Sequence, residues 1–259
     1  MLTDKGFRKQ VIDQVTDSEV QGFWLQEVAN WTDRYEKEAT PAILNKLGQF
    51  TANPLVRRVL DAPQSSLNLR RVMDQQQILL VKLSQGKLGE DAARLLASLV
   101  MAGIQQAAMS RADLAKEDRN PFYVYADEYA TYVNESFADT LAQARKYGLY
   151  LTAAQQIIEQ VDSTIMAPMF GNCKTLISFQ VARDDAEALA DQFTGDVTAP
   201  DLQQLPKYHA SVRMDIDGIP TRPFTIATLP PPKPSGQHAK LTSIETVSRR
   251  RFASPAVSV

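Results

Sequence analysis

Apolar runs of about four to eight residues alternate with stretches of helical periodicity through the middle of the chain. These runs lie near residues 78–83, 121–126, 149–154 and 174–181. Runs of this length are typical of strands, and strands that alternate with helices favour an α/β fold with a parallel sheet and right-handed crossovers. Because the runs are almost continuously apolar, we expect the strands to be covered on both faces. The pattern predicts one α/β core over residues 65–230.

The chain before this core has helical periodicity instead. Apolar side chains recur every three or four residues, at Val20, Trp24, Val28, Trp31 and Tyr35. Thr40-Pro41 and Asn53-Pro54 each look like a capping residue followed by proline at the first helical position. We therefore expect a helical segment over residues 1–64, with helices that begin at both prolines.

A hairpin and a proline-rich linker are expected near the carboxyl-terminal end. Residues 208–215 and 222–228 predict two strands, and the dipeptide Asp217-Gly218 between them favours a tight hairpin turn. The three prolines at 230–232 mark the start of a linker. We expect the linker and tail, residues 231–259, to be mobile or to form a short helix that docks only in a larger assembly.

Two adjacent acids, Asp127 and Glu128, close the second apolar run. Ligands of open α/β sheets bind at the carboxyl ends of the strands. There one carboxylate can support a magnesium ion, and its neighbour can orient or deprotonate an attacking water, as in a Walker B element. Gln155 and Gln156 close the next run, so parallel strands would bring both pairs to one sheet edge. The alternative is that the glutamines only begin the next helix.

The segment between these two strands predicts a helix. Its start is indicated by Ser136 with Asp139 three residues later, and its end by Gly148. Apolar side chains recur between them at helical spacing, at Phe137, Leu141 and Ala144.

Arg145 lies beside this apolar stripe, one turn before the glycine that ends the helix. A cation near a helix carboxyl end stabilises the helix by roughly 0.3–1 kcal/mol. The other reading is an arginine finger that reaches the nucleotide of a neighbouring subunit. Spacing alone favours the helix-end role.

Composition indicates a packed soluble protein. The 259 residues are 44% hydrophobic and 22% charged, enough for one sizeable core. The longest apolar run, residues 95–104, is too short to span a membrane, and we expect no transmembrane anchor or signal peptide. The single cysteine excludes a disulfide within the chain. With 28 basic and 30 acidic residues the net charge is −2, so we expect weak DNA affinity for the chain alone.

Several separately placed motifs resemble one family. Residues 121–156, PFYVYADEYATYVNESFADTLAQARKYGLYLTAAQQ, resemble the carboxyl half of the TraG/TraD-like conjugative coupling-protein ATPases of type IV secretion, within the HerA–FtsK superfamily. Residues 78–99 are similar to the strand, loop and helix that precede Walker B in that family. Residues 170–193 and 223–229 are similar to its closing strands and helices. The resemblance covers roughly residues 20–255 and the motifs follow the family order.

The resemblance implies a RecA-like P-loop NTPase core whose cofactors are ATP and Mg²⁺. It implies that Asp127 serves the magnesium ion, through water, and that Glu128 serves the attacking water. It also implies that Arg145 is the finger that acts on a neighbouring subunit, that Gln156 senses the terminal phosphate and that Gln155 lies at the cofactor.

The phosphate loop of such a core is missing from the sequence, because no GxxxxGK[ST] pattern occurs in it. Gly86-Lys87 is followed by leucine, which cannot bind magnesium, and residues 171–175 have the wrong glycine spacing and follow the acid pair. We therefore expect the phosphate loop and the first strand of the fold upstream of Met1. The chain would then be the carboxyl half of a motor and would not hydrolyse ATP by itself.

The resemblance implies ATP-driven movement of DNA during conjugative or mobile-element transfer, by a homohexamer joined to the missing phosphate-loop half. One alternative is a non-catalytic module derived from such a motor, which binds relaxosome or secretion-channel proteins. The other is a HerA-like DNA-processing helicase subunit. The expected location is the cytoplasm, with attachment to the inner face of the membrane only through a missing amino-terminal part or through partners.

Overall fold

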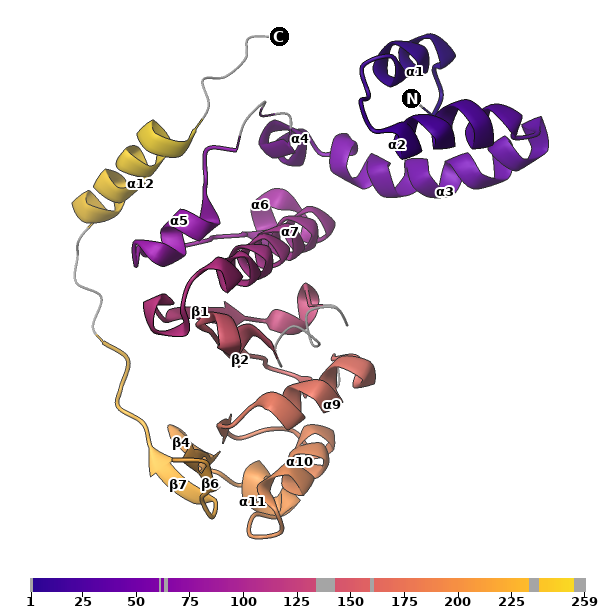
Figure 1. Ribbon diagram of the computed structural model, residues 1–259. Helices are drawn as coiled ribbons and strands as arrows, with labels where there is room; N and C mark the ends of the chain where they lie inside the picture. The colour runs from indigo at the N-terminus through magenta and orange to yellow at the C-terminus, as the bar shows by residue number, and fades with distance from the viewer. Residues whose placement is uncertain are drawn as a thin grey trace. The chain divides into compact units, whose positions relative to one another are not determined.

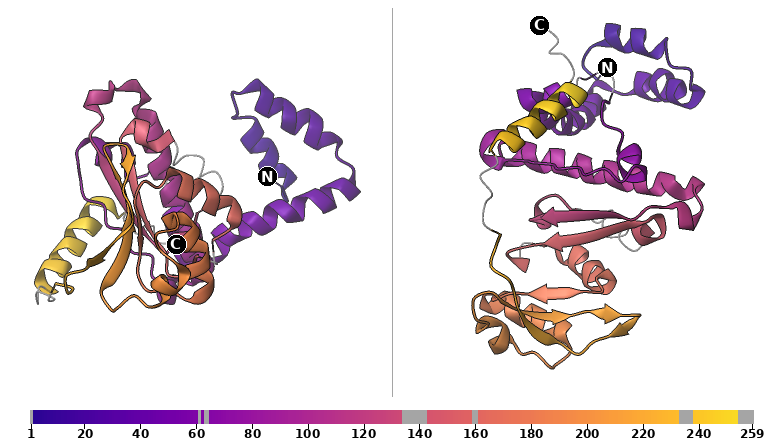
Figure 2. Two further views of the ribbon diagram at one scale, coloured as in Figure 1. Left: turned by 90° about the horizontal axis from the view of Figure 1, so that it is seen from below. Right: turned by 90° about the vertical axis from the view of Figure 1, so that its left-hand side faces the viewer.

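The computed structural model describes residues 2–60, 62, 65–133, 143–158, 161–232 and 238–253. The helix signals predicted at Ser136, Phe137, Asp139 and Leu141 lie outside the described residues. The chain divides into two compact units, whose elements are labelled in Figure 1 and seen from two further sides in Figure 2. The first unit contains Met1–Ala62 and Gln85–Ala92, and the second contains Pro63–Ser84 and Ala93–Val259.

Every regular element of the first unit is helical within its described residues. The elements are α1 (Lys5–Ile12), α2 (Ser18–Gly22), the short turns η1 (Phe23–Glu27) and η2 (Val28–Asn30), α3 (Asp33–Ala52), α4 (Pro54–Leu60) and α6 (Gln85–Leu88). The helix α7 (Glu90–Met109) begins here and continues into the second unit.

One of the two predicted helix starts is confirmed and the other is wrong. Helix α4 begins at Pro54, and Asn53 caps it by accepting a hydrogen bond from Leu55 N at 2.9 Å. Helix α3 instead begins at Asp33, after the cap Thr32, and continues through Pro41. Thr40 is buried and its hydroxyl has no partner within the described chain, so it caps nothing.

A two-stranded parallel sheet forms the centre of the second unit. It pairs β1 (Phe122–Asp127) with β2 (Leu149–Ala154), from Phe122 opposite Leu149 to Asp127 opposite Ala154. Both strands and their parallel pairing confirm the prediction. One face of the sheet packs against α5 (Leu69–Asp74) and α7 through a cluster of buried side chains: Met73, Ile104, Ala107, Ala108, Ala144 and Leu149.

The opposite face of this sheet is open, which contradicts the expectation that its strands are covered on both faces. Phe122, Val124 and Ala126 alternate with side chains that face outward. Tyr123 is 61% exposed and Tyr125 is 78% exposed. The described chain supplies helices for one face only, so the apolar run indicates a second covering layer that these residues do not contain.

The predicted strand over residues 78–83 is wrong. These residues form neither helix nor strand, and Ile78 is 90% exposed while Leu80 is 79% exposed. An apolar run becomes a strand only where a neighbouring edge pairs with it and a packed layer covers it. The described chain gives this run no strand partner.

A second sheet holds β3 (Leu176–Ser178), β4 (His209–Arg213) and β7 (Phe224–Ala227), all antiparallel. Strand β3 covers only the middle of the predicted run 174–181. Helix α9 (Ser163–Asn172) connects β2 to β3. The short elements α10 (Arg183–Ala190), η8 (Asp191–Phe193) and α11 (Ala199–Gln203) form a core of their own around Phe193 and Leu202, which are fully buried.

The predicted hairpin is confirmed. Strands β5 (Asp215–Ile216) and β6 (Ile219–Pro220) pair at its tip. Asp217 and Gly218 both have positive φ, at 53° and 82°, as a two-residue hairpin turn requires. The tail forms a helix, α12 (His238–Phe252), which is one of the two alternatives expected for it, and its residues from Lys240 onward are exposed.

One helical stretch, residues 90–113, is long and apolar enough to cross a membrane by length and composition alone. It consists of α7 and the turn η3 (Ser110–Asp113). Ile104, Ala107 and Ala108 belong to the buried cluster beneath β1 and β2. A core helix passes the same test, so this stretch is weak evidence for a membrane span.

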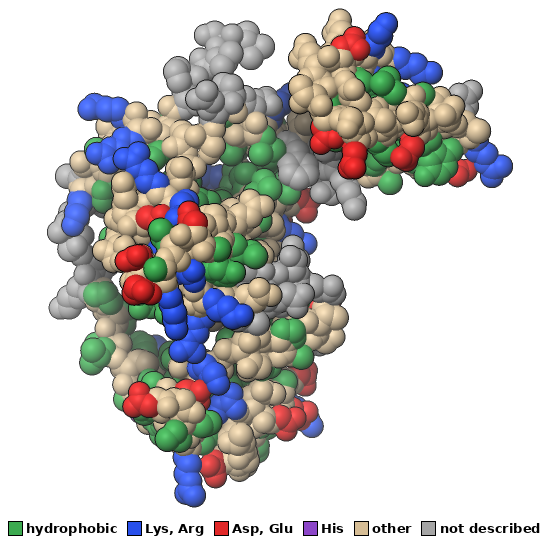
Figure 3. All heavy atoms as spheres, in the orientation of Figure 1, with side chains coloured by type: hydrophobic (Ala, Val, Ile, Leu, Met, Phe, Trp, Pro, Cys, Tyr) green, Lys and Arg blue, Asp and Glu red, His purple; other side chains and the backbone are tan. Residues whose placement is uncertain are grey.

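In the view of Figure 3, hydrophobic and charged side chains are interspersed on the described surface.

The turn before β2 requires glycine at position 148. Gly148 has φ +74°, and an added Cβ would lie 3.2 Å from Arg111 Nη1 and 3.2 Å from Arg119 O. Both the backbone conformation and the space therefore exclude a side chain.

We predict that Gly148→Ala lowers the free energy of unfolding by about 2 kcal/mol, because alanine is strained at positive φ and cannot fit without displacing its neighbours. Gly171→Ala is the matched control. Gly171 lies in α9 with nothing within 4 Å of a built Cβ, so alanine there should be neutral or stabilise by up to about 1 kcal/mol. Urea unfolding measures both changes, and equal effects of the two substitutions would contradict the prediction.

Candidate functional site

The acid pair forms a sharp turn at the carboxyl end of β1. Asp127 is the last residue of the strand, and Glu128 has a left-handed backbone with φ 50° and ψ 44°. The Glu128 amide donates to Asp127 Oδ1 at 3.1 Å, and the Thr131 hydroxyl donates to Glu128 O at 2.9 Å. A left-handed non-glycine residue costs of order 1–3 kcal/mol and is frequent at functional sites.

Both glutamines bond to this acidic turn. Gln155 Oε1 accepts a hydrogen bond from Ala130 N at 3.1 Å, and Gln156 Nε2 donates to Glu128 Oε1 at 2.9 Å. Gln155 and Gln156 lie outside any helix, so the alternative that they begin the next helix is wrong. As predicted, the structure brings four residues together at the carboxyl ends of β1 and β2: Asp127, Glu128, Gln155 and Gln156.

Tyr132 is a member of this site that the sequence did not indicate. Its hydroxyl donates to Asp127 O at 2.9 Å. Burial, followed by the negative charges of Asp127 and Glu128, raises the pKa of Tyr132 to about 12. The tyrosine lies five residues after the acid, a spacing that carries no motif, so only the fold reveals it.

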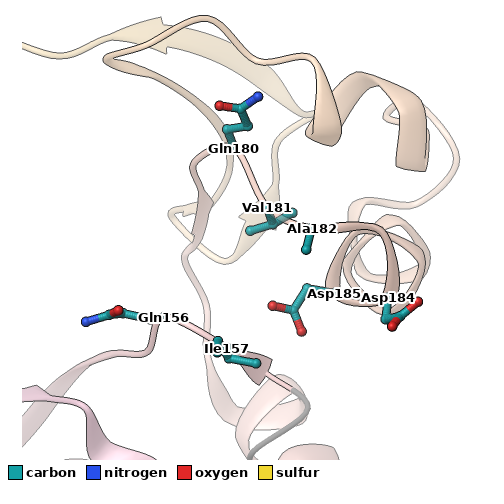
Figure 4. A pocket seen from close by; sticks show the side chains of 7 residues that line it. All are labelled: Gln156, Ile157, Gln180, Val181, Ala182, Asp184 and Asp185. Carbon is teal, nitrogen blue, oxygen red and sulfur yellow. The ribbon is translucent and has the colours of Figure 1, made fainter.

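A pocket of about 540 Å³ lies between the carboxyl ends of β2 and β3, as Figure 4 shows. Gln156 and Ile157 follow β2 and form one wall. The other wall is formed by residues that follow β3 and begin α10: Gln180, Val181, Ala182, Asp184 and Asp185.

The two walls of the pocket are joined by a buried carboxylate. Asp185 Oδ1 accepts a hydrogen bond from Ile158 N at 3.1 Å, which ties the segment after β2 to the start of α10. Gln180 Nε2 donates to Gln203 O at 2.8 Å. Gln180 comes soon after the end of β3 at Ser178, but the sequence placed it inside the predicted run 174–181, so the signal that identified Gln155 and Gln156 did not identify Gln180.

Among the described residues, strands β2 and β3 each have a strand partner on one edge only, as β1 does. The sheet orders are β1-β2 and β3-β4-β7. The chain passes from β2 through α9 to β3, and the residues that follow both strands line the same pocket. A strand–helix–strand crossover normally joins parallel strands of one sheet. Here those two strands are in separate sheets within the described chain.

The structure does not bring Arg145 to the acids. Arg145 begins the turn η6 (Arg145–Tyr147), which precedes the amino end of β2, whereas Gln155 follows its carboxyl end. A six-residue strand spans roughly 20 Å, so Arg145 cannot act at Asp127 of its own chain. Its side chain is exposed and has no hydrogen bond or ion pair among the described residues.

The residues present fit part of a magnesium–nucleotide site. Mg²⁺ in nucleotide sites is held by one or two carboxylates together with phosphate oxygens and water, and the exposed Asp127 supplies such a carboxylate. No group of three or more His, Cys, Asp or Glu residues could hold a metal within the described part of the chain. No GxxxxGK[ST] pattern occurs in the sequence, so the residues present do not include a phosphate loop.

No protein-family model and no curated protein matches the chain. The structure is similar to the plasmid coupling protein TrwB in complex with ADP and Mg²⁺, with TM-score 0.63, 16% identity, and coverage of 87% of this chain and 58% of that one. Similarity to TrwB with a non-hydrolysable GTP analogue gives TM-score 0.60, 16% identity, and coverage of 83% and 56%. A weaker likeness, with TM-score 0.43 and 14% identity, covers 64% of this chain and 74% of a genome packaging NTPase from Sulfolobus turreted icosahedral virus 2.

The chain has the fold of the conjugative coupling protein TrwB, a mixed α/β fold with a parallel sheet. This confirms, at the level of the fold, the resemblance that the motifs indicated. The chain spans a little over half of the TrwB chains in these two comparisons.

We predict that Tyr132 makes the stability of the chain sensitive to alkali. Its folded pKa of about 12 exceeds the value of about 10 for an unperturbed tyrosine, so its contribution is complete below pH about 10 and is lost as the pH rises towards 12. Urea midpoints should therefore fall less over this range in Tyr132→Phe than in the wild-type chain. Equal alkaline losses in the two proteins would mean that partial burial beside the acids does not raise the pKa of Tyr132.

Proposed function

We propose that this chain is the carboxyl-terminal half of an ATP-driven motor that moves DNA in conjugative or mobile-element transfer. The observation that carries the proposal is the acid–glutamine site at the carboxyl ends of β1 and β2. Within the described residues this sheet has only two strands, and the face that carries Tyr123 and Tyr125 is open. A phosphate-loop segment completes both the sheet and the nucleotide site. The fold shared with TrwB supports this assignment.

The strand of the missing segment inserts between β2 and β3. Three observations support this position. Each strand has one edge without a strand partner among the described residues, a helix connects the two strands, and the residues that follow both strands line one pocket. The loop after an inserted parallel strand would enter that pocket beside Gln156 and Gln180. Backbone amides of a glycine-rich loop would there hold the phosphates opposite Asp127 and Glu128.

The open face of β1 and β2 supports a covering helix in the same segment. Tyr123 and Tyr150 stack across the two strands, with ring centroids 5.3 Å apart, and Tyr125 lies farther along the same face. Burying one large apolar side chain stabilises a fold by about 1.5–3 kcal/mol. Covering three tyrosines would therefore provide much of the energy that binds the missing half.

In the completed site Asp127 would hold the magnesium ion through water, and Glu128 would accept the proton of the attacking water. When bound, the ion neutralises charge on the phosphates. Gln156 would sense the terminal phosphate, since its amide already bonds to Glu128. Gln155 would keep the acidic turn in place at the cofactor through Ala130 N.

Arg145 would act on the nucleotide of the next subunit in a homohexamer. Arg145 lies at the amino end of β2, too far from the acids of its own chain to act on them, and its side chain is exposed. Both facts support a role between subunits. The proposed partners are therefore the phosphate-loop half, further copies of the chain and DNA. The proposed domains are the helical segment 1–64, the core 65–230 and the tail 231–259.

A non-catalytic module that binds relaxosome or secretion-channel proteins is the second candidate. The observation that favours it is α12, an exposed helix with Leu241, Ile244 and Val247 on its surface. Joining the chain to a phosphate-loop segment, from the sequence upstream of Met1 or from TrwB, distinguishes the two candidates. Hydrolysis by the joined protein supports the motor, and its absence in a folded, nucleotide-binding assembly supports the module.

We predict that the joined assembly hydrolyses ATP faster when DNA is present, and that Glu128→Gln abolishes hydrolysis while ATP binding is kept. Glutamine preserves the shape of the side chain but cannot accept the proton of the water. Glu117→Gln, a change of an exposed acid outside the site, is the control and should retain activity. Parallel loss of binding and hydrolysis in Glu128→Gln would instead make Glu128 structural.

We predict that Arg145→Ala reduces turnover by about 10³–10⁵-fold, with a cost in stability of at most about 1 kcal/mol. Mixing Arg145→Ala subunits with phosphate-loop-dead subunits should restore part of the activity. One subunit then brings an intact nucleotide site and its neighbour brings an intact arginine. Mixed hexamers that form normally but remain inactive would refute the role between subunits.

A further inference from the structure

Arg145 begins a turn in which every backbone carbonyl, from residue 145 to residue 148, accepts a hydrogen bond. Arg119 Nη1 donates to Lys146 O at 2.6 Å, and Arg111 Nη1 donates to Tyr147 O at 3.0 Å. The Phe122 amide donates to Gly148 O at 2.8 Å, and the Gly148 amide donates to Arg145 O at 3.1 Å. Four successive carbonyls therefore have defined donors.

Arg119 is itself held in one orientation. Its Nε and Nη2 atoms both donate to Leu114 O, at 3.1 Å and 2.7 Å. Its guanidinium carbon lies 5.4 Å from the centre of the Tyr147 ring, a cation–π arrangement. The Arg119 side chain thus joins the loop before β1 to the turn before β2. Rotation of this side chain would break these hydrogen bonds.

The second donor, Arg111, is fully buried and paired. Its Nε donates to Asp74 Oδ1 at 3.0 Å and its Nη2 donates to Asn120 O at 2.7 Å. Arg70 bonds to the other oxygen of Asp74, so this carboxylate lies between two guanidinium groups. A buried charge is tolerated only where such partners satisfy it.

The side chain of Arg145 contrasts with this fixed backbone. It is exposed and takes no part in the network within the described residues. A catalytic side chain that must reach another subunit benefits from a rigid backbone, because a misplacement of about 1 Å can cost roughly 10²-fold in rate.

We propose that Arg119, together with the Asp74–Arg111 pair, positions Arg145 for its action on the neighbouring subunit. These residues bond to the turn at the amino end of β2, whereas the acids and glutamines lie at the carboxyl ends of the strands, so they are positioning residues. The inference rests on the proposed function, since Arg145 needs a neighbouring nucleotide on which to act. Arg119 is the residue to test, because Arg111 is fully buried and its removal would take the donors from Tyr147 O and Asn120 O and one partner from Asp74, which endangers folding.

A double-mutant cycle in the joined assembly tests this role. Arg119→Met keeps an apolar stem over Tyr147 but removes the hydrogen bond to Lys146 O. It should lower kcat by about 10–10²-fold with KM for ATP unchanged. In the Arg145→Ala background the same change should have no further effect, because Arg119 acts only through Arg145. Arg34→Met, which removes an exposed arginine paired with Glu38, is the matched control and should retain turnover.

Amide hydrogen exchange on the chain alone provides a readout without activity. Arg119→Met should accelerate exchange at residues 146–148 and leave β4 unchanged. Arg119→Lys keeps one donor and should have smaller effects in both measurements; it also serves if the methionine variant fails to fold. Loss of kcat that persists in the Arg145→Ala background, no loss of kcat, or unchanged exchange would each overturn the inference. No hydrolysis by any joined assembly, or full activity of Arg145→Ala, would instead refute the proposed function.

Discussion

Backbone hydrogen bonding between parallel strands is the constraint on which this structure depends. A strand inside an α/β sheet needs a partner on both edges and a layer on both faces, because its polar backbone and apolar side chains are otherwise left to water. Strands β2 and β3 meet this requirement on one edge each, and the face that carries Tyr123 and Tyr125 is open. The acid–glutamine site is therefore formed at the carboxyl ends of β1 and β2, and in the proposed motor a further strand would place the ligand there.

The proposed insertion connects three separate features. The pocket between the carboxyl ends of β2 and β3, the exposed tyrosines and the lack of a phosphate loop would all follow from one missing segment. Glu128, held in a left-handed conformation and bonded to Gln156, is already formed without that segment. The turn at the amino end of β2 is also fully formed, because the backbone carbonyls of residues 145–148 all accept hydrogen bonds.

Local patterns predicted the parts of this fold that local forces determine. The limits of β2, the turn at Asp217-Gly218 and the convergence of the acids with the glutamines follow from strand length, turn chemistry and the direction of parallel strands. The predictions failed where a distant layer decides the outcome. Residues 78–83 are apolar enough for a strand but have no strand partner, and Thr40 is buried in the helix it was expected to begin. The arginine network around the turn joins residues far apart in sequence, and Tyr132 bonds to Asp127 at a spacing that belongs to no motif, so no pattern in the sequence could reveal either.

Hydrogen exchange at the facing strand edges tests the missing-strand account most directly. The amides of Leu149–Ala154 and Leu176–Ser178 would be measured in the chain alone and after a phosphate-loop segment is joined to it. The account predicts that amides on the edges away from β1 and β4 gain protection, while β4, already paired on both edges, serves as the internal reference. An active assembly in which neither β2 nor β3 gains protection would contradict the insertion of a strand between them.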